Sequence, residues 1–460
     1  MNDSVNTGGA TSAGLATGDS DSGLKRVLGV PSLVLFGLVY MVPLTVFTTY
    51  GIVTQITGGR LPLAYIVTLV TMLFTARSYG LMARAFPFAG SAYTYAQRSF
   101  GAAPGFLVGW SLLLDYLFLP MLNYLVIGIY MEAAFPAVPA WVWIVASIAL
   151  VTALNIVGIV SVARTNILIL AVQGLFIVVF IALAISAMSQ AGTVDPAAPF
   201  TGTGDPDGFG PIAAGAAVLC LSFLGFDSVS TLAEETPDPK RNIPRAIMIT
   251  TLGAGILFVI LAYVGHLVFP SHTFSDVDSA ALDVMGAAGG QFLAAFFTAA
   301  YVAGCIGSAL TSQASVSRIL FAMGRDSVLP RGFFGQLNAR FGTPVLSILT
   351  VSVISLIAIF IDLGLLAEMV SFGALIAFSA VNASVIKHYF LDEKLRSGAG
   401  DAITYLVAPA IGFVLTLWLW TSLSGRTFTV GLIWLAAGVV YLAVLTRGFR
   451  RPTPMLDLKE

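Results

Sequence analysis

The sequence has 460 residues, of which 57% are hydrophobic and 10% are charged, with a mean hydropathy of +0.92 and a formal net charge of -1. Soluble proteins carry about 25% charged residues, so this composition excludes the ordinary soluble classes and predicts a membrane protein. The two cysteines, Cys220 and Cys305, stand inside apolar runs, which excludes a disulfide framework and a cysteine metal site.

A polar stretch precedes the apolar chain. Residues 1–23 lack the basic start and apolar core of a signal peptide, so we expect a disordered tail. A membrane-spanning helix needs about 20 mostly apolar residues. The segments that meet this need are 28–55, 62–82, 93–130, 141–160, 166–188, 211–234, 246–269, 290–322, 343–361, 364–386, 403–423 and 428–446. The third and the eighth are long, and we expect them to tilt or to extend beyond the bilayer.

The basic residues predict how these twelve segments are oriented. If the N-terminus is cytoplasmic, every Lys and Arg except Arg60 and Arg426 falls on the inner side, as the positive-inside rule requires. Both termini are then cytoplasmic. The outer loops are acidic, with Asp195, Asp205, Asp207, Asp276, Asp278 and Asp283. They are either ordinary solvated loops or the source of a weak field that attracts cations.

Two segments contain a break in the helix. In the first it lies at Pro43, which lacks an amide hydrogen, and in the sixth at residues 222–227. Each broken segment opens a block of five, 28–188 and 211–388, and an odd number of spans inserts the second block upside down. We therefore expect an all-α membrane fold of two inverted five-helix repeats plus two further helices. The expected regions are a tail (1–23), a first repeat (24–188), an outer loop (189–210), a second repeat (211–388), two last spans (389–446) and a tail (447–460).

Two acids stand inside the membrane-spanning segments, Asp115 in the third and Asp227 in the sixth. A carboxylate is costly in hydrocarbon, and such residues mark substrate or proton pathways. The sequence shows no evident basic partner, so two interpretations stay open. Each acid is a protonated carboxyl that is hydrogen-bonded to a neighbouring helix, or it exchanges a proton for an amine that arrives as the substrate.

Aromatic residues cluster around both acids. Tyr116 follows Asp115 directly, and Phe223 and Phe226 flank the break at 222–227. Aromatic faces attract ammonium groups by about 0.5–2 kcal/mol, although a single aromatic residue more often serves packing. These residues favour a site for a small cation.

The patterns of an enzyme are missing from the sequence. The histidines His266, His272 and His388 are scattered, and there is no metal-ligand cluster or P-loop. The glycine-rich run 286–290 is predicted to be a loop and not a nucleotide site, because no strand precedes it. We expect no enzymatic activity, no cofactor or metal, and no nucleic-acid partner.

The sequence resembles the amino acid–polyamine–organocation transporters, and among them the bacterial putrescine importers, from about Leu24 to Arg451. The resemblance rests on PFAGSAYTYAQRSFG from Pro87, GWSLLLDYLFLPMLN from Gly109, SFLGFDSVSTLAEETPDPKRNIPRAI from Ser222 and SQASVSRILFAMGRDSVLP from Ser312. The second motif points to the putrescine branch. The resemblance implies a LeuT-like fold in which the first and sixth spans are unwound.

The resemblance also implies roles for individual residues. Asp227 would contact a substrate amine or a transported proton, Tyr116 would bind substrate, and Tyr93 would close a cytoplasmic gate. The complete expected set is Asp227, Tyr116, Phe226, Phe223, Tyr40, Val42, Pro43, Thr45 and Asp115 for the substrate, Tyr93 and Leu221 for gating, and Asp227 for coupling.

Two departures from the family pattern bear on the substrate. Many members hold the substrate carboxylate with a glycine-serine-glycine run in the first span, where this sequence has residues 42–45, VPLT. Proline offers no amide hydrogen, which argues for an amine without a carboxylate. Some proton-coupled relatives carry a lysine in the fifth span, where the register places Gln173. Glutamine does not titrate, so Asp227 is the expected proton carrier.

These observations predict a multi-pass secondary transporter of the inner membrane that imports putrescine or a related diamine by alternating access, driven by the proton motive force. Its partners would be the diamine, protons and the lipid bilayer; the oligomeric state stays open. One alternative is an amino-acid permease or an amine exchanger. Another is a sensor that does not transport, although the tails at 1–23 and 447–460 are short for a signalling domain. An intramembrane enzyme would need a nucleophile–base or metal set.

Overall fold

The structure is a computed structural model that describes residues 28–87, 91–158, 162–192, 194–202, 208–325, 329–338, 340–448 and 450. The tail expected at 1–23 and most of the tail at 447–460 lie outside these residues. The described chain is almost entirely helical and contains no strand. An all-α membrane fold is therefore confirmed.

The helices follow the apolar segments of the sequence. In chain order they are α1 (Val30–Met41), η1 (Pro43–Phe47), α2 (Tyr50–Ile56), α3 (Leu61–Ala85), α4 (Ser91–Phe100), α5 (Ala102–Ala134), α6 (Ala140–Val157), α7 (Val162–Ala191), α8 (Ala198–Thr201), α9 (Gly210–Leu219), η2 (Cys220–Phe223), η3 (Ser228–Glu235), α10 (Pro239–Val268), α11 (Ala281–Arg325), α12 (Arg331–Phe334), α13 (Val345–Ser355), η4 (Leu356–Ile359), α14 (Leu363–Val385), η5 (Ile386–Asp392), α15 (Ala399–Ala402), η6 (Ile403–Val407), α16 (Ala408–Thr421) and α17 (Gly425–Leu445).

Among the described residues, 11 helical segments are long and apolar enough to cross a membrane. The ninth predicted span corresponds to the shorter apolar helix Val345–Ile359. The third predicted span is two helices, because the chain turns at Gly101, where φ is +96°. The prediction of a loop at 286–290 is wrong. These residues belong to α11, which has a kink at Gly289 and Gly290.

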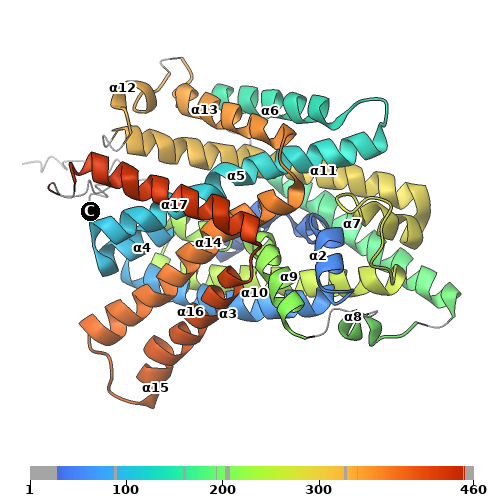
Figure 1. Cartoon of the computed structure of the whole chain (residues 1–460), viewed down its shortest axis with the longest axis horizontal. Helices are drawn as coiled ribbons and strands as arrows, with labels where there is room; N and C mark the ends of the chain where they lie inside the picture. The colour runs from blue at the N-terminus through green and yellow to red at the C-terminus, as the bar shows by residue number, and fades with distance from the viewer. Residues whose placement is uncertain are drawn as a thin grey trace, which may run out of the picture.

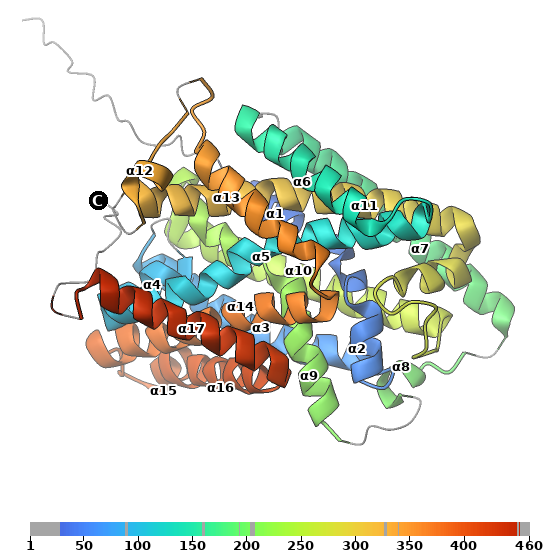
Figure 2. The same cartoon turned by 45° about the horizontal axis from the view of Figure 1, so that its top comes forward.

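Most helices run along the long axis of the molecule, and short helices lie toward its two ends (Figures 1 and 2). The α4, α12 and α15 helices lie at one end, called here the α4 end. The α2 and α8 helices lie toward the other, called here the α2 end. α5 crosses the middle and packs against α4, α6, α11 and α14.

Burial separates the central helices from the outer ones. The most deeply buried spans are Gly210–Ala233 and α5, whereas most of α6, α7, α16 and α17 faces outward. The outward faces carry large apolar side chains such as Leu168, Val178, Ile433 and Val444. Such a surface is stable only in lipid, and both membrane-embedded acids belong to the two buried spans.

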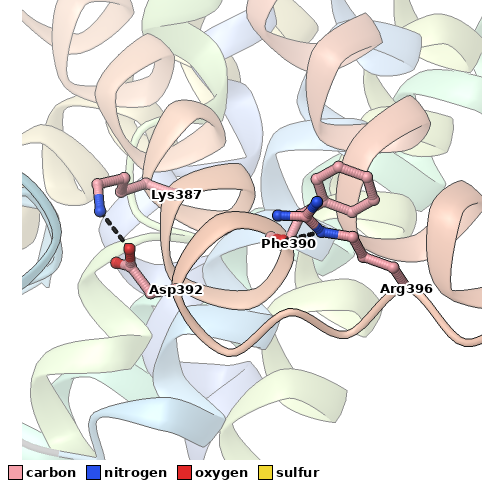
Figure 3. Close-up of polar contacts among 4 residues, drawn as sticks. All are labelled: Lys387, Phe390, Asp392 and Arg396. Atoms are coloured by element: carbon pink, nitrogen blue, oxygen red, sulfur yellow. Dashed lines mark hydrogen bonds and ion pairs between the residues drawn. The ribbon is translucent and has the colours of Figure 1, made fainter.

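The helix η5 and the residues that follow it hold two basic side chains in local contacts (Figure 3). Lys387 pairs with Asp392, and the Arg396 guanidinium lies 4.8 Å from the centre of the Phe390 ring. The Arg396 Nε also donates to the Phe390 carbonyl at 2.8 Å. These local contacts leave the charged groups at the surface, where they stabilise the turn only modestly.

Candidate functional site

The first helix ends where Val42 adopts a φ of +54° and a ψ of 101°. A branched residue is strained in this region, and the following Pro43 cannot continue the helical hydrogen bonds. Thr45 supports the turn, because its Oγ1 donates to the Met41 carbonyl at 2.5 Å and its N donates to the Val42 carbonyl at 2.8 Å. The break predicted in the first span is thus confirmed and lies at Val42.

The second break spans Leu224 to Asp227. Gly225 has a φ of +129°, a conformation that side chains rarely permit. Ser228 Oγ donates to the Gly225 carbonyl at 2.6 Å, and Ser230 Oγ donates to the Asp227 carbonyl at 2.6 Å. These serines satisfy backbone groups that a continuous helix would pair. Beyond the break, η3 follows as a 3₁₀ helix and not an α-helix.

The two breaks touch each other. A Cβ atom on Gly225 would lie 2.8 Å from Met41 Cγ and 3.0 Å from Tyr40 Cδ1. Only glycine allows this approach without a shift of its neighbours. The junction therefore brings the end of α1 against the unwound segment that carries Asp227.

Both acids are buried at this junction, each with 3% of its surface exposed. Asp227 Oδ1 accepts from the Gly225 amide at 3.1 Å, whereas Asp115 Oδ1 has no hydrogen-bond partner among the described residues. The two carboxyl groups lie close enough to interact electrostatically. No described basic side chain forms a salt bridge with either acid. A buried acid pair without a cation is energetically costly and suited to a positively charged ligand.

Four tyrosines interact electrostatically with one or both acids. Tyr40 of α1 and Tyr116 of α5 interact electrostatically with both acids. Tyr79 of α3 and Tyr95 of α4 interact with Asp227. The Tyr40 hydroxyl is buried and lacks a hydrogen-bond partner among the described residues. The acids thus interact with tyrosines from four helices.

A small cavity lies beside the junction, toward the α2 end of α5. It is lined by Tyr40, Met41, Val42, Thr45, Thr48, Leu119, Leu122, Asn123, Val126, Leu221, Leu224, Tyr301, Cys305 and Ser308. Its volume is about 20 Å³, which is room for one or two waters. This conformation is closed, and a larger ligand enters only if the surrounding helices separate.

The structure groups the predicted site residues in three sets. Tyr40, Val42, Thr45 and Leu221 line the cavity. Asp115, Tyr116 and Asp227 lie around Tyr40, and Pro43 directly follows the first break. The positions are compatible with binding, although the individual roles stay predictions.

The remaining predicted residues lie away from the cavity. Phe223 packs edge-on against Phe258, with 5.4 Å between the ring centres, and Phe226 packs against Tyr79 and Phe378. Tyr93 lies against α5, because a Cβ on Gly109 would be 2.7 Å from Tyr93 Cδ2. In this closed conformation these three side chains contribute packing, and gating by Tyr93 stays a prediction.

Sequence reasoning missed the contribution of α11. Tyr301, Cys305 and Ser308 line one wall of the cavity, and the Tyr301 hydroxyl hydrogen-bonds Thr48 across it. Their spacing of i, i+4 and i+7 places them on one helix face. That spacing is visible in the sequence, but an apolar span offers many such stripes, and only the break at Val42 selects this one.

Gln173 lies beside the first break. A Cβ on Gly304 would contact the Gln173 Nε2, and it would lie 3.1 Å from Val42 Cγ1. The side chain is buried, and its Oε1 has no hydrogen-bond partner among the described residues. An uncharged amide thus occupies this buried position beside Val42.

A second polar cluster, called here the Gln313 cluster, joins α5, α6, α11 and α13. Gln313 Oε1 accepts from Asn155 Nδ2 at 2.9 Å and from the Tyr124 hydroxyl at 3.3 Å. Gln313 Nε2 donates to Ser352 Oγ at 2.7 Å, and Ser352 Oγ shares a 2.6 Å hydrogen bond with Thr152. The cluster holds the wall that carries Ser308 against α5.

The acidic loop before α11 is partly structural. Asp283 accepts from the Ser275 amide and hydroxyl, and Asp276 accepts from Ser279. Burial, followed by the nearby Asp276 and Asp362, raises the pKa of the Asp278 carboxyl. Asp205 and Asp207 lie outside the described residues. The loop therefore uses two of its acids for its own turns.

Comparison with known proteins places this site in a family. The amino acid permease family model matches residues 32–445. The low-affinity putrescine importer PlaP of Escherichia coli K12 is 41% identical over 441 residues, which cover 94% of this chain and 96% of that protein. The branched-chain amino acid permease BcaP of Bacillus subtilis is 28% identical over 464 residues, covering 94% and 96%.

A solved structure shares the fold. MhsT, crystallised in complex with L-phenylalanine, superposes with a TM-score of 0.62 at 14% identity, over 87% of this chain and 100% of that one. MhsT has the LeuT fold, so the likeness extends that architecture to this chain. The family and the similar proteins are transporters and not enzymes. With most of its length matched by the family model, this chain belongs to the amino acid permease family, a family of multi-pass membrane transporters.

Proposed function

We propose that this protein imports putrescine or a related diamine across the cell inner membrane. The observation that carries the proposal is the buried pair Asp115 and Asp227, which lies at the junction of two broken helices and forms no salt bridge with a described basic residue. A dicationic substrate supplies the missing positive charge. The 41% identity to PlaP, a putrescine importer, supports the same substrate class.

In this proposal one ammonium group binds Asp227, with Asp115 beside it and the Tyr40 and Tyr116 rings around it. The charge-assisted hydrogen bond and the aromatic faces offset the loss of water around the ammonium. Phe226 and Phe223 support the unwound segment from behind. Pro43 keeps the first break open without an amide to bind a carboxylate.

Alternating access then follows from movement of the two broken spans against the remaining helices, in two inverted repeats. Leu221 closes the cavity at the second break, and Tyr93 closes the α4 end. The α4 end is cytoplasmic, together with both termini, because the basic residues favour that side. An inside-negative potential draws a dication inward by about 4.6 kcal/mol per 100 mV. Asp227 carries a proton on the empty return step, so each cycle exchanges one outward proton for one inward dication. The membrane potential, the electrical part of the proton motive force, then drives the net inward movement of one positive charge.

The alternative of an amino-acid permease is favoured by the 28% identity to BcaP. It requires a site for the substrate carboxylate near an ammonium site. Val42 and Pro43 occupy the first break, and the acid pair would repel a second carboxylate. We therefore prefer the diamine.

The test is uptake of labelled putrescine into inside-negative vesicles, with and without a pH gradient. Unlabelled spermidine, agmatine, ornithine and neutral amino acids serve as competitors. The proposal expects saturable uptake that diamines inhibit and neutral amino acids do not. Inhibition by amino acids, or uptake only against internal substrate, would favour the permease or exchanger.

A further inference from the structure

Asn123 has an unusually constrained position at the far side of the cavity. Its Nδ2 donates to the Leu119 carbonyl at 2.9 Å and to Ser308 Oγ at 3.1 Å. The Leu119 carbonyl only accepts hydrogen bonds, so it determines which end of the amide faces it. Both N–H groups are used, and the Oδ1 atom remains as an acceptor on a side chain that lines the cavity.

Asp115 and Asn123 both lie on α5, about 80° apart around the helix axis. Asp115, Leu119, Leu122 and Val126 share a helix face by their spacing of four, three and four residues, and the last three line the cavity. Asn123 follows Asp115 by eight residues, which corresponds to about 12 Å along the axis. Both side chains lean toward the helix N-terminus, so their polar ends keep about this separation.

This separation matches a short diamine. Five bonds of about 1.5 Å in a zigzag place the nitrogens of extended putrescine about 6 Å apart. A hydrogen bond of about 2.9 Å at each end brings the two acceptors to about 12 Å. Between them the wall is apolar, with Leu119, Leu122, Leu221 and Leu224, as four methylene groups require.

An additional acceptor lies between the two ends. Pro120 interrupts the hydrogen bonding of α5, because it has no N–H to donate to the carbonyl of Tyr116, four residues earlier. That carbonyl therefore lacks its usual donor within the helix. Between Asp115 and Asn123, α5 also carries no basic side chain.

We propose that Asn123, held by Leu119 and Ser308, is the site of the second ammonium group and makes the transporter select diamines over monoamines. This inference rests on the proposed function, in which the acid pair binds the first ammonium. It assigns chain-length selection to the distance between Asp115 and Asn123, and it requires the cavity to widen around Tyr40 when the substrate enters.

The test compares putrescine with n-butylamine, which has the same carbon chain and one amine. Inhibition of labelled-putrescine uptake gives the apparent affinity of each compound, and 1,3-diaminopropane and cadaverine report the length preference. In Asn123→Leu, the apparent affinity for putrescine should fall by roughly 10- to 100-fold, the range for a hydrogen bond to a charged group. The apparent affinity for butylamine should change by less than about threefold. Asn155→Leu, which removes an amide from the Gln313 cluster, is the matched control. It should keep the wild-type ratio of putrescine affinity to butylamine affinity.

Asn123→Asp keeps an acceptor and adds charge, so it should preserve or increase the preference for putrescine. If Asn123→Leu does not transport, the ratio of putrescine affinity to butylamine affinity is measured on Asn123→Asp and Asn123→Ser. The measurement is displacement of bound putrescine from the purified protein, and Asn123→Ser should show a lower ratio than wild type. An unchanged ratio of putrescine affinity to butylamine affinity in Asn123→Leu or in Asn123→Ser, or a lost preference in Asn123→Asp, would overturn the subsite. Failure of the proposed function is a different result, because the wild-type protein would then take up no putrescine.

Discussion

The acid pair and the Gln313 cluster are two buried polar regions with opposite hydrogen-bonding character. In the Gln313 cluster both ends of the amide have partners, including Ser352 and Asn155. At the acid pair, Asp115 Oδ1 and the Tyr40 hydroxyl have no partner among the described residues. Both regions contact α5, and they differ in whether their buried polar groups have partners.

The difference indicates what each region is for. A satisfied network stabilises one arrangement of helices, whereas unsatisfied groups cost about 1–3 kcal/mol each until a ligand pairs with them. The Gln313 cluster is therefore a rigid support, and the acid pair is a binding site that is incomplete without a cation.

The largest effect is expected for Asp227→Asn. The substitution removes the charge that pairs with the substrate ammonium, and loss of one partner of a buried ion pair costs about 3–5 kcal/mol. Uptake of labelled putrescine should fall by roughly 100-fold or more, with normal membrane insertion. Asp195→Asn, on an exposed loop acid, should transport normally. Near-normal uptake by Asp227→Asn would remove this residue from the site.

Gly225→Ala tests the contact between the two breaks. The new Cβ would meet Met41 and Tyr40, and the φ of +129° would strain any side chain. Such strain costs about 1–3 kcal/mol, and we expect a roughly tenfold lower uptake rate. Gly286→Ala is the control, because no atom lies within 4 Å of its Cβ position. Equal rates in the two variants would show that the close approach is unimportant for transport.

Tyr116→Leu should have the smallest effect on transport. It removes an aromatic face near the ammonium and keeps a similar apolar volume, so we expect an apparent KM about 3- to 10-fold higher at an unchanged maximal rate, from a loss of roughly 1 kcal/mol. Initial-rate measurements over a range of putrescine concentrations give both parameters. If the KM does not change, Tyr116 only packs.

Much of the fold could be predicted from the sequence. Apolar segments and the distribution of Lys and Arg indicated the spans, and Pro43 and Gly225 marked both breaks, because their backbone chemistry acts locally. The kink at Gly289 and Gly290 was not foreseen, since a glycine-rich run is equally compatible with a loop. Which helices pack against one another depends on contacts between residues that are distant in the sequence, and no local pattern determines these contacts.

The site was predicted in part for the same reason. Asp115 and Asp227 stood out because charge is rare in membrane spans, yet their mutual proximity required the structure. Tyr301 and Ser308 resemble ordinary residues of an apolar helix, and they matter only because α11 lies opposite the first break. Asn123 gained its significance from the hydrogen bonds that orient its amide.

The central claim is that a cation completes the acid pair, and thermal unfolding of purified protein with and without putrescine tests it most directly. Asp115→Leu removes an unpaired buried acid, which is neutral or stabilising, so its Tm without ligand should equal or exceed that of wild type. Gln313→Leu deprives Asn155 and Ser352 of partners and should lower the Tm by roughly 2–5 °C.

Addition of putrescine separates the two variants. A ligand at 100 times its Kd stabilises the folded protein by about 2.7 kcal/mol. We predict that putrescine raises the Tm of wild type and of Gln313→Leu by similar amounts and leaves that of Asp115→Leu nearly unchanged. An equal rise in all three proteins, or a large loss of stability in Asp115→Leu without ligand, would contradict the account, because Asp115 would then be a structural residue.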